Sequence, residues 1–326
     1  MNDALKTLIL KATQSKAISS SIEIQPLWSG YGQILRCELA GGNHRSVVVK
    51  HVQLPDETNH PRGWNTNLSH ERKLKSYHVE MSWYSDLAKQ CDRLCRVPQI
   101  FHLSDQTFEM LMVMEDLNTV GYPIRKSELS MAEMKVCLNW LAHFHAKFMG
   151  TKSDQLWEVG TYWHLNTRPD EWEAMQDHEL KAAAQSIDRI LNQAKYQTLV
   201  HGDAKLANFC FSADGQEVAA VDFQYIGHGC GMKDVAYFLS SCLHENDLTI
   251  CESELLNFYF EALKKALVLY NQSIDFEEIQ QEWSRLYDYA WADFYRFLDG
   301  WSPGHWKMHD YSKKIKEKVI HELANS

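Results

Sequence analysis

The stretch LVHGDAKLANFCFSADGQEVAAVDFQ, which runs from Leu199 to Gln224, decides how this sequence is interpreted. It contains two short apolar runs joined by the turn sequence Ala-Asp-Gly-Gln, a pattern typical of a hairpin. Asn208 stands before the first strand of this hairpin, and Asp222 ends the second. A hairpin would therefore bring these two side chains to the same end of a two-stranded ribbon.

Phosphoryl transfer from a nucleotide needs few kinds of chemical group, and this stretch supplies several of them. A carboxylate must accept or orient the proton of the attacking hydroxyl, and Asp203 stands on a loop where it could do so. Amide and carboxylate oxygens suit Mg²⁺, so Asn208 and Asp222 are candidate magnesium ligands. Lys205 could place an ammonium near the phosphoryl group in transit. The alternative is that these residues only form turns, but their occurrence together with His201 favours a functional site.

The order HGDAKLAN, hairpin, VDFQ resembles the catalytic and metal-binding segments of the aminoglycoside phosphotransferase and choline kinase superfamily, which shares the protein-kinase-like fold. The sequence is most similar to the ecdysteroid-kinase-like branch of that superfamily. The resemblance extends over most of the chain, from Ile22 to Trp301, and is strongest between Leu199 and Leu239.

The resemblance implies a role for each matching residue of the catalytic segment. Asp203 is implied as the catalytic base, and Asn208 and Asp222 are implied as the ligands of Mg²⁺. His201 and Asp234 are implied as structural supports of the catalytic loop. The alternative for Asp234 is an acid at a helix N-terminus, which is favourable in its own right.

Residues earlier in the chain match the nucleotide-binding parts of the family. Lys50, in VVVKHV, stands where the family keeps its phosphate-binding lysine, and Glu80 is placed to pair with it. The alternative for Lys50 is an outward-facing residue on a strand, and the alternative for Glu80 is an acid on a solvated helix face. Glu71 is a competing partner for Lys50. The other implied ATP contacts are Ser29, Gly30 and Gly32 in a turn over the phosphates, and Met114, Glu115 and Leu117 in a connector at the adenine.

Differences from the protein-kinase sequence pattern narrow the range of expected acceptor substrates. Asp234 follows Asp222 by only 12 positions, which leaves no room for a protein-kinase activation segment. Gln224 stands where protein kinases have glycine, Ala204 where the family usually has leucine, and Lys205 is more like the catalytic lysine of protein kinases. The sequence therefore predicts ATP- and Mg²⁺-dependent phosphorylation of a small-molecule hydroxyl on an amino alcohol, a sterol-like compound, a sugar or an aminoglycoside. A protein serine/threonine kinase and a non-catalytic nucleotide-binding module are the alternatives.

The pattern of apolar runs predicts an α+β, bilobal, protein-kinase-like fold. Three β-branched runs, a helix and two further runs predict a five-stranded antiparallel sheet with one main helix in residues 1–117. The pattern of residues 118–326 predicts a mostly helical catalytic and acceptor-binding lobe. Within it, Ser130 and Glu133 have the spacing of a capping box.

The late helices are rich in aromatic residues. Aromatic faces could hold a quaternary ammonium by cation–π attraction or a sterol or sugar ring by apolar contact, although packing in the core is the alternative for most of them. Trp301 and Trp306, in GWSPGHWKMH, are the candidate acceptor contacts. His143 and His145 are two positions apart, so a helix splays them and buried structural roles are expected.

Composition limits the remaining classes of partner. The 326 residues are 45% hydrophobic and carry a formal net charge of −10, which disfavours nucleic-acid binding. No apolar run reaches the ~18–20 residues that cross a bilayer, and the N-terminal sequence does not have the pattern of a signal peptide. The 8 cysteines contain no CxxC pair and indicate reduced thiols. We expect a cytoplasmic protein whose partner is a small molecule, with neither nucleic-acid nor membrane partners.

Overall fold

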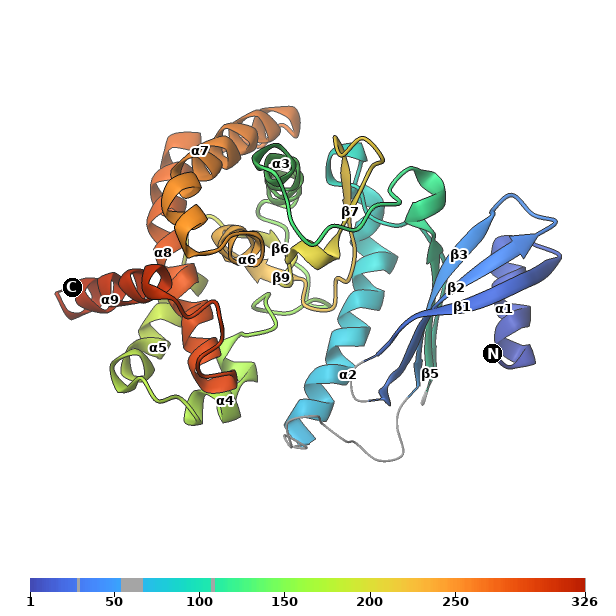
Figure 1. Cartoon of the computed structure of the whole chain (residues 1–326), viewed down its shortest axis with the longest axis horizontal. Coiled ribbons are helices and arrows are strands. Elements are labelled where there is room, and N and C mark those ends of the chain that lie inside the picture. Colours follow the sequence, from blue (N-terminus) through green and yellow to red (C-terminus); the bar gives the residue numbers. More distant parts are fainter. Residues whose placement is uncertain (28–29, 54–66, 107–108, 326) are drawn as a thin grey trace. The chain divides into compact units, whose positions relative to one another are not determined.

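The structure is a computed structural model that describes residues 1–27, 30–53, 67–106 and 109–325 (Figure 1). The chain divides into two compact units. The first comprises residues 1–92, 96–124 and 210–221, and the second comprises residues 93–95, 125–209 and 222–326.

The first unit contains the predicted five-stranded antiparallel sheet, in the order β1-β2-β3-β5-β4. Its strands are β1 (Ala17–Pro26), β2 (Gly32–Ala40), β3 (Ser46–Gln53), β4 (Ile100–Gln106) and β5 (Glu109–Glu115). Two helices accompany the sheet, α1 (Asp3–Thr13) and α2 (Asn67–Ser82). This arrangement confirms the five-stranded antiparallel sheet that the β-branched apolar runs predicted.

The two helices lie on opposite faces of this sheet (Figure 1). Leu5 and Ile9 of α1 form one core cluster with Val47 and Val49 of β3, two residues that point to the same face of the strand. Lys50 is the next residue, so its side chain points to the other face, toward α2. The alternation of the strand therefore decides which helix Lys50 meets.

The hairpin predicted from its Asp-Gly turn is present and groups with the first unit. Its strands are β7 (Phe209–Phe211) and β8 (Val218–Ala220). The backbone of Phe211 pairs with Ile124, and that of Ala219 with Arg96. Leu117 and Cys210 share a small buried cluster with Ala219. A segment from the middle of the sequence thus completes a unit built mostly from the N-terminal residues.

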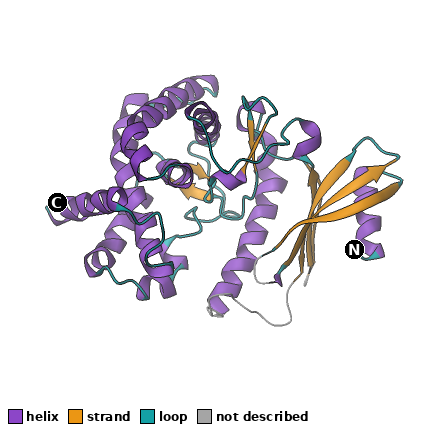
Figure 2. Ribbon diagram, in the orientation of Figure 1, coloured by secondary structure: helices purple, strands orange, loops and turns teal. Residues whose placement is uncertain are grey.

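The second unit is mostly helical, as Figure 2 shows. Its helices are α3 (Met131–Lys147), α4 (Pro169–Glu173), α5 (His178–Asn192), α6 (Met232–Cys242), α7 (Glu245–Leu269), α8 (Phe276–Trp301) and α9 (Asp310–Ala324). Helix α8 packs against α4, α5, α6 and α9, while α3 packs against α7. The capping box predicted at the start of α3 is confirmed, with Ser130 and Glu133 exchanging both hydrogen bonds.

The second unit also contains a two-stranded sheet that was not predicted. It pairs β6 (Thr198–Val200) with β9 (Gly227–Gly229). The sequence of β9 is Gly-His-Gly, which has none of the β-branched or aromatic residues that mark a strand. This sheet joins the two ends of the catalytic segment, because β6 precedes the loop with Asp203 and β9 follows Asp222.

Two other sequence expectations can be compared with the described residues. All 8 cysteines are free thiols. Among the described residues, no helix combines the length and hydropathy that a membrane span requires.

The buried ion pair between Lys50 and Glu80 gives the first test. Lys50 Nζ lies 2.5 Å from Glu80 Oε2, and the two residues are only 3% and 1% exposed. We expect Glu80→Ala to lower the free energy of unfolding by about 3–5 kcal/mol, since it takes from a buried ammonium the carboxylate that it contacts.

Urea unfolding followed by circular dichroism would measure this loss. Glu71→Ala is the matched control, because Glu71 is exposed on the same helix and its loss should change stability by less than about 0.5 kcal/mol. Equal losses for the two variants would contradict the expectation.

Candidate active site

The loop after β6 carries Asp203 and fixes its carboxylate from one side. Asp203 is 6% exposed. Its Oδ2 accepts hydrogen bonds from Lys205 Nζ at 2.8 Å and from Asn208 Nδ2 at 3.1 Å. Asn208 Nδ2 also donates to the Asp203 carbonyl oxygen at 2.8 Å. The other carboxylate oxygen, Oδ1, is buried and accepts no well-formed hydrogen bond from a described residue, although the Tyr237 hydroxyl is close enough to interact with the carboxylate.

The environment of Asp203 makes its carboxylate more basic than an ordinary aspartate. Burial raises the pKa of Asp203, and the neighbouring charge of Asp222 raises it further. Lys205 opposes both effects, because its ammonium stabilises the ionised carboxylate. A raised pKa suits a group that must take a proton from a hydroxyl.

Lys205 lies against Asp203 and interacts with it strongly. Burial on its own would lower the pKa of Lys205, but the charge of Asp203 and its hydrogen bond outweigh this effect, and the pKa is raised. The lysine therefore stays protonated and keeps a positive charge beside the carboxylate.

Asp234, at the start of α6, holds the backbone of the catalytic loop. Its carboxylate accepts from His201 N at 2.5 Å and from Gly202 N at 2.9 Å. His201 Nδ1 in turn accepts from Asp203 N at 3.2 Å, and its ring packs on Phe223 at a centroid distance of 4.5 Å. Both predicted support residues therefore contact the loop directly.

His145 is a member of this site that was expected only to be a buried structural residue. Its Nε2 lies 3.1 Å from Asp234 Oδ2, and its Nδ1 lies 2.8 Å from Tyr259 OH. His145 and Asp234 are 89 residues apart in the sequence. No local pattern could have paired them, although a histidine inside the apolar face of a helix was a signal of a buried polar partner. Its neighbour His143 bonds Tyr270 instead.

The backbone on both sides of the site adopts unusual conformations. Gly202 has a φ of +79°, and a Cβ placed there would lie 2.0 Å from the Tyr225 carbonyl oxygen, so only glycine fits. Asp222 has a φ of +70°, which is rare for a residue with a side chain. Its Oδ1 accepts from Gln224 Nε2 at 3.0 Å. Such conformations concentrate at functional sites.

The oxygen groups near Asp203 fit a magnesium ion better than a transition metal. Among the described residues, no cluster of three or more His, Cys, Asp and Glu side chains could hold a metal. Magnesium does not need such a cluster, since it usually takes one or two protein carboxylates and otherwise phosphate and water. Asn208 and Asp222 offer an amide and a carboxylate at the open end of the β7–β8 hairpin, and Asp222 is near enough to influence Asp203 electrostatically.

The residues predicted to contact ATP lie in the first unit. Lys50 and Glu80 form the buried pair described above. Gly30 and Gly32 lie before and at the start of β2, both with positive φ, whereas Ser29 lies outside the described residues. Met114 and Glu115 end β5, and Leu117 begins the 3₁₀ helix Leu117–Val120.

The two predicted acceptor contacts differ in their surroundings. Trp301 is partly buried and stacks on Phe297 with ring centroids 5.5 Å apart. Trp306 is 50% exposed and lies next to the rings of His244 and His305. Most of the other aromatic residues of α8 are buried, which confirms the core-packing alternative for them.

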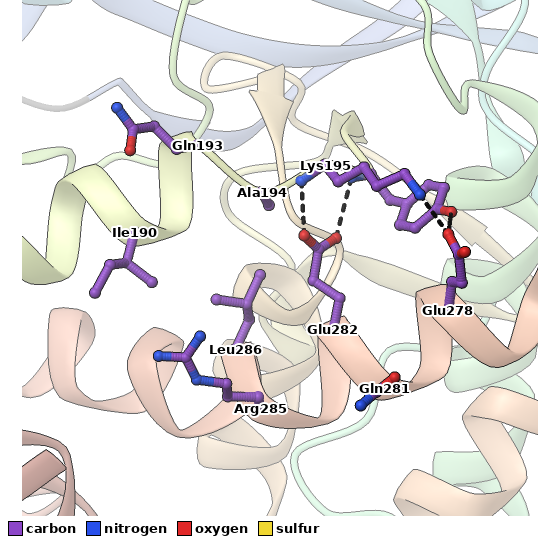
Figure 3. A pocket seen from close by; sticks show the side chains of 10 residues that line it. Ile190, Gln193, Ala194, Lys195, Glu278, Gln281, Glu282, Arg285 and Leu286 are labelled. Carbon is purple, nitrogen blue, oxygen red and sulfur yellow. Dashed lines mark hydrogen bonds and ion pairs between the residues drawn. The ribbon is translucent and has the colours of Figure 1, made fainter. Parts of the chain in front are cut away.

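A cavity of about 500 Å³ lies elsewhere in the second unit, between the end of α5 and helix α8 (Figure 3). None of its lining residues is a predicted site residue. Glu282 accepts there from the backbone N–H groups of Lys195 and Tyr196 at 2.7 and 3.0 Å, and Glu278 pairs with the Lys195 ammonium. These polar groups satisfy one another, so the cavity is not a second candidate for the chemistry.

The solved structures that are similar to this chain include kinases and a phosphotransferase. A choline kinase from Cryptosporidium parvum gives a TM-score of 0.55 at 10% identity, covering 98% of this chain and 96% of that chain. An aminoglycoside-3'-phosphotransferase of type VIII gives 0.49 at 17% identity, covering 89% and 98%. A Plasmodium vivax ethanolamine kinase gives 0.49 at 13% identity, covering 93% and 82%. At such identities the likeness concerns the fold, which is best supported by the choline kinase.

The fold and the family match together define a protein of the kinase-like phosphotransferase class. The profile of the ecdysteroid kinase-like family matches residues 43–159 and 149–272. The chain therefore belongs to the ecdysteroid kinase-like family and is a small-molecule kinase. No curated protein gave a significant match. The superfamily and the branch predicted from the HGDAKLAN and VDFQ segments are confirmed.

The left-handed conformation of Gly202 gives the second test. We expect Gly202→Ala to destabilise the protein by more than about 3 kcal/mol, because the new Cβ would overlap a backbone oxygen. Gly304→Ala is the control, since Gly304 has the same φ of +79° but a Cβ at that position would meet no atom within 4 Å. It should lose only the about 1–2 kcal/mol that left-handed backbone costs. Urea unfolding would compare the free energies of unfolding of the two variants. Similar losses in both would contradict the expectation that the contact with the Tyr225 oxygen adds to the cost at Gly202.

Proposed function

We propose that this protein transfers the γ-phosphoryl group of ATP to a hydroxyl of a small molecule, with Asp203 as general base and with Mg²⁺ held by Asn208 and Asp222. The observation that carries the proposal is the state of the Asp203 carboxylate. One of its oxygens is held by Lys205 and Asn208, and the other is buried without a hydrogen bond from the described residues.

This geometry supports a simple proton transfer. The hydroxyl of the acceptor would donate to Asp203 Oδ1 and pass its proton there as the oxygen bonds to the γ-phosphorus. The bond from that phosphorus to the bridging oxygen breaks, and ADP leaves with the electron pair. Lys205 and Asn208 keep the carboxylate in place, while Asp234 keeps the loop backbone in place.

Asn208 and Asp222 would hold the metal through their side-chain oxygens. A bound Mg²⁺ supplies neutralising charge for the phosphate oxygens. Asn208 could hold Asp203 and the metal at the same time, since its amide nitrogen donates to Asp203 while its amide oxygen would bind the metal. In the first unit, Lys50 would bind phosphate oxygens, and the carboxylate of Glu80 would hold its ammonium in position.

The short connection after Asp222 supports a small acceptor over a protein substrate. The residues that follow it form β9 and then lead directly into α6 at Met232. A segment that positions a peptide, as activation segments do, has no place in this connection. The presence of a buried basic carboxylate argues against a module that binds nucleotide without turnover, since binding alone does not need a base.

Asp203→Asn tests the proposed base. We expect turnover to fall by about 10²–10⁴-fold because the general base is lost, while the affinity for ATP stays within a few-fold. ADP release would be measured with ATP, Mg²⁺ and a panel of hydroxyl compounds, with a generic protein substrate in a parallel assay.

Asp214→Asn is the matched control for this substitution, because Asp214 is an exposed aspartate in the turn of the β7–β8 hairpin. It should keep the turnover of the unaltered protein. Undiminished turnover in Asp203→Asn would exclude Asp203 as the base, and turnover on the protein substrate alone would favour the protein kinase.

Asp222→Ala tests the proposed metal site. We expect the variant to lose the part of its ATP affinity that depends on Mg²⁺, because a carboxylate ligand is removed. Calorimetric titration with ATP in Mg²⁺ and in EDTA would separate the two contributions. The affinity in EDTA should match that of the unaltered protein, whereas an unchanged response to Mg²⁺ would contradict the assignment.

A further inference from the structure

Lys307 is a buried lysine that the proposed chemistry does not use. It lies between α8 and α9 and is 8% exposed. Its Nζ donates to Ser240 Oγ at 3.2 Å. The ammonium lies over three aromatic rings, at 4.9 Å from the centroid of Tyr237, 5.3 Å from Phe294 and 5.5 Å from Trp306. Among the described residues, no carboxylate lies within ion-pair distance of it.

The segment around Lys307 is fixed rather than loosely attached. Its backbone N–H donates to His305 Nδ1 at 3.2 Å, and its carbonyl oxygen accepts from Ser312 Oγ at 2.9 Å. The position of the ammonium over the rings is therefore set by the fold.

The ring cage around Lys307 reaches the proposed base. Burial lowers the pKa of Lys307 to about 8, and Asp203 and Lys205 are among the charges that act on it. Burial raises the pKa of the Tyr237 phenol, with further contributions from Tyr162 and from Asp203. The geometry agrees, because the Tyr237 ring lies 5.5 Å from the ring of Tyr162, and the backbone N–H of Tyr162 donates to the carbonyl oxygen of Gly202 in the catalytic loop at 3.2 Å.

Three aromatic faces around one point form the kind of cage that binds an ammonium ligand. In this protein the cage already contains an ammonium, which belongs to the chain itself. A cationic acceptor placed beside Asp203 would lose the cation–π site and would also meet a like charge in a region of low dielectric. A hydroxyl or an anionic group could instead accept a hydrogen bond, since a lysine ammonium has three donors and Ser240 uses one.

We propose that Lys307 is a specificity-determining residue that fills the aromatic cage of Tyr237, Phe294 and Trp306, so that the site admits neutral or anionic hydroxyl compounds and rejects cationic ones. This inference rests on the proposed function, because it concerns the acceptor of that reaction. It removes amino alcohols and aminoglycosides from the range of acceptors that the sequence left open.

Binding of tetramethylammonium tests the proposal without the natural acceptor. The unaltered protein should bind it weakly at pH 7. Lys307→Ala, which removes both the charge and the side chain that fills the cage, should bind it roughly tenfold or more tightly. Lys307→Arg should not gain affinity, because it keeps the charge. Tryptophan fluorescence titration reports the affinity, and thermal melting shows that each variant is folded.

Lys264→Ala is a matched control for the loss of a lysine from an aromatic ring. Lys264 Nζ lies 4.9 Å from the centroid of the Phe276 ring on the second unit. This variant should gain no affinity, since one ring does not form a cage. Equal tetramethylammonium affinity in the unaltered protein and in Lys307→Ala would overturn the proposal, as would an equal gain in Lys264→Ala.

A measurement on the unaltered protein keeps the proposal testable even where Lys307→Ala does not fold. The ionisable groups around Lys307 are Asp203 and Lys205 on the catalytic loop, Tyr237 and Cys242 on α6, and His305 in its own segment. The pKa of Cys242 is raised to about 12, and those of Tyr237 and Lys205 are raised above their usual values near 10. Affinity for tetramethylammonium should therefore rise between pH 7 and pH 9.5 as Lys307 loses its proton, and a flat profile would overturn the proposal.

Turnover separates this inference from the function on which it rests. The assay compares choline, ethanolamine and kanamycin with uncharged sugars and sterols as acceptors. Efficient turnover of the cations would overturn the role of Lys307 and leave the proposed kinase reaction intact. Absence of turnover on every compound would count against the proposed function, while the tetramethylammonium titrations would still decide the role of Lys307.

Discussion

The hydrogen bonds to Asp234 are the interaction on which the rest of the site depends. This carboxylate is fully buried, which would be strongly unfavourable without donors around it. The backbone N–H groups of His201 and Gly202 supply two donors, and His145 supplies a third. The other ring nitrogen of His145, Nδ1, lies 2.8 Å from the Tyr259 hydroxyl, so the ring links Asp234 to Tyr259. One residue of α6 thus joins α3, α7 and the catalytic loop.

The position of Asp203 follows from this support. The loop can turn sharply at Gly202 because glycine tolerates the left-handed backbone and the nearby Tyr225 oxygen. Asn208, in the 3₁₀ turn that follows, binds both the carbonyl oxygen and the carboxylate of Asp203. The carboxylate therefore has one oxygen that is held by two donors and one oxygen that is not. As the proposed base, Asp203 would not need to rearrange when a hydroxyl arrives.

Charges of both signs are close together around the proposed base, Asp203. The charge of Asp222 helps to raise the pKa of Asp203, while Lys205 favours the ionised form of Asp203. Lys307, whose ammonium lies over the ring of Tyr237, supplies a second ammonium that acts on this group of charges. A phosphoryl group and a metal bring further charge to such a site, so the balance among these side chains controls which ligands are tolerated. The aromatic rings of the cage contribute to that balance because they hold the Lys307 ammonium in place.

The sequence by itself determined those features that depend on neighbouring residues. The β-branched apolar runs, the Asp-Gly hairpin turn and the Ser130–Glu133 capping box each involve only a few neighbouring positions, so one chain shows their patterns directly. The HGDAKLAN and VDFQ segments were sufficient for the family and for the candidate roles of Asp203, Asn208 and Asp222, whose roles remain predictions. Only the tertiary structure decided that β9 pairs with β6, that His145 meets Asp234, and that Lys307 occupies an aromatic cage. Those contacts join residues far apart in the chain, and their free energy comes from burial and geometry that no short pattern encodes.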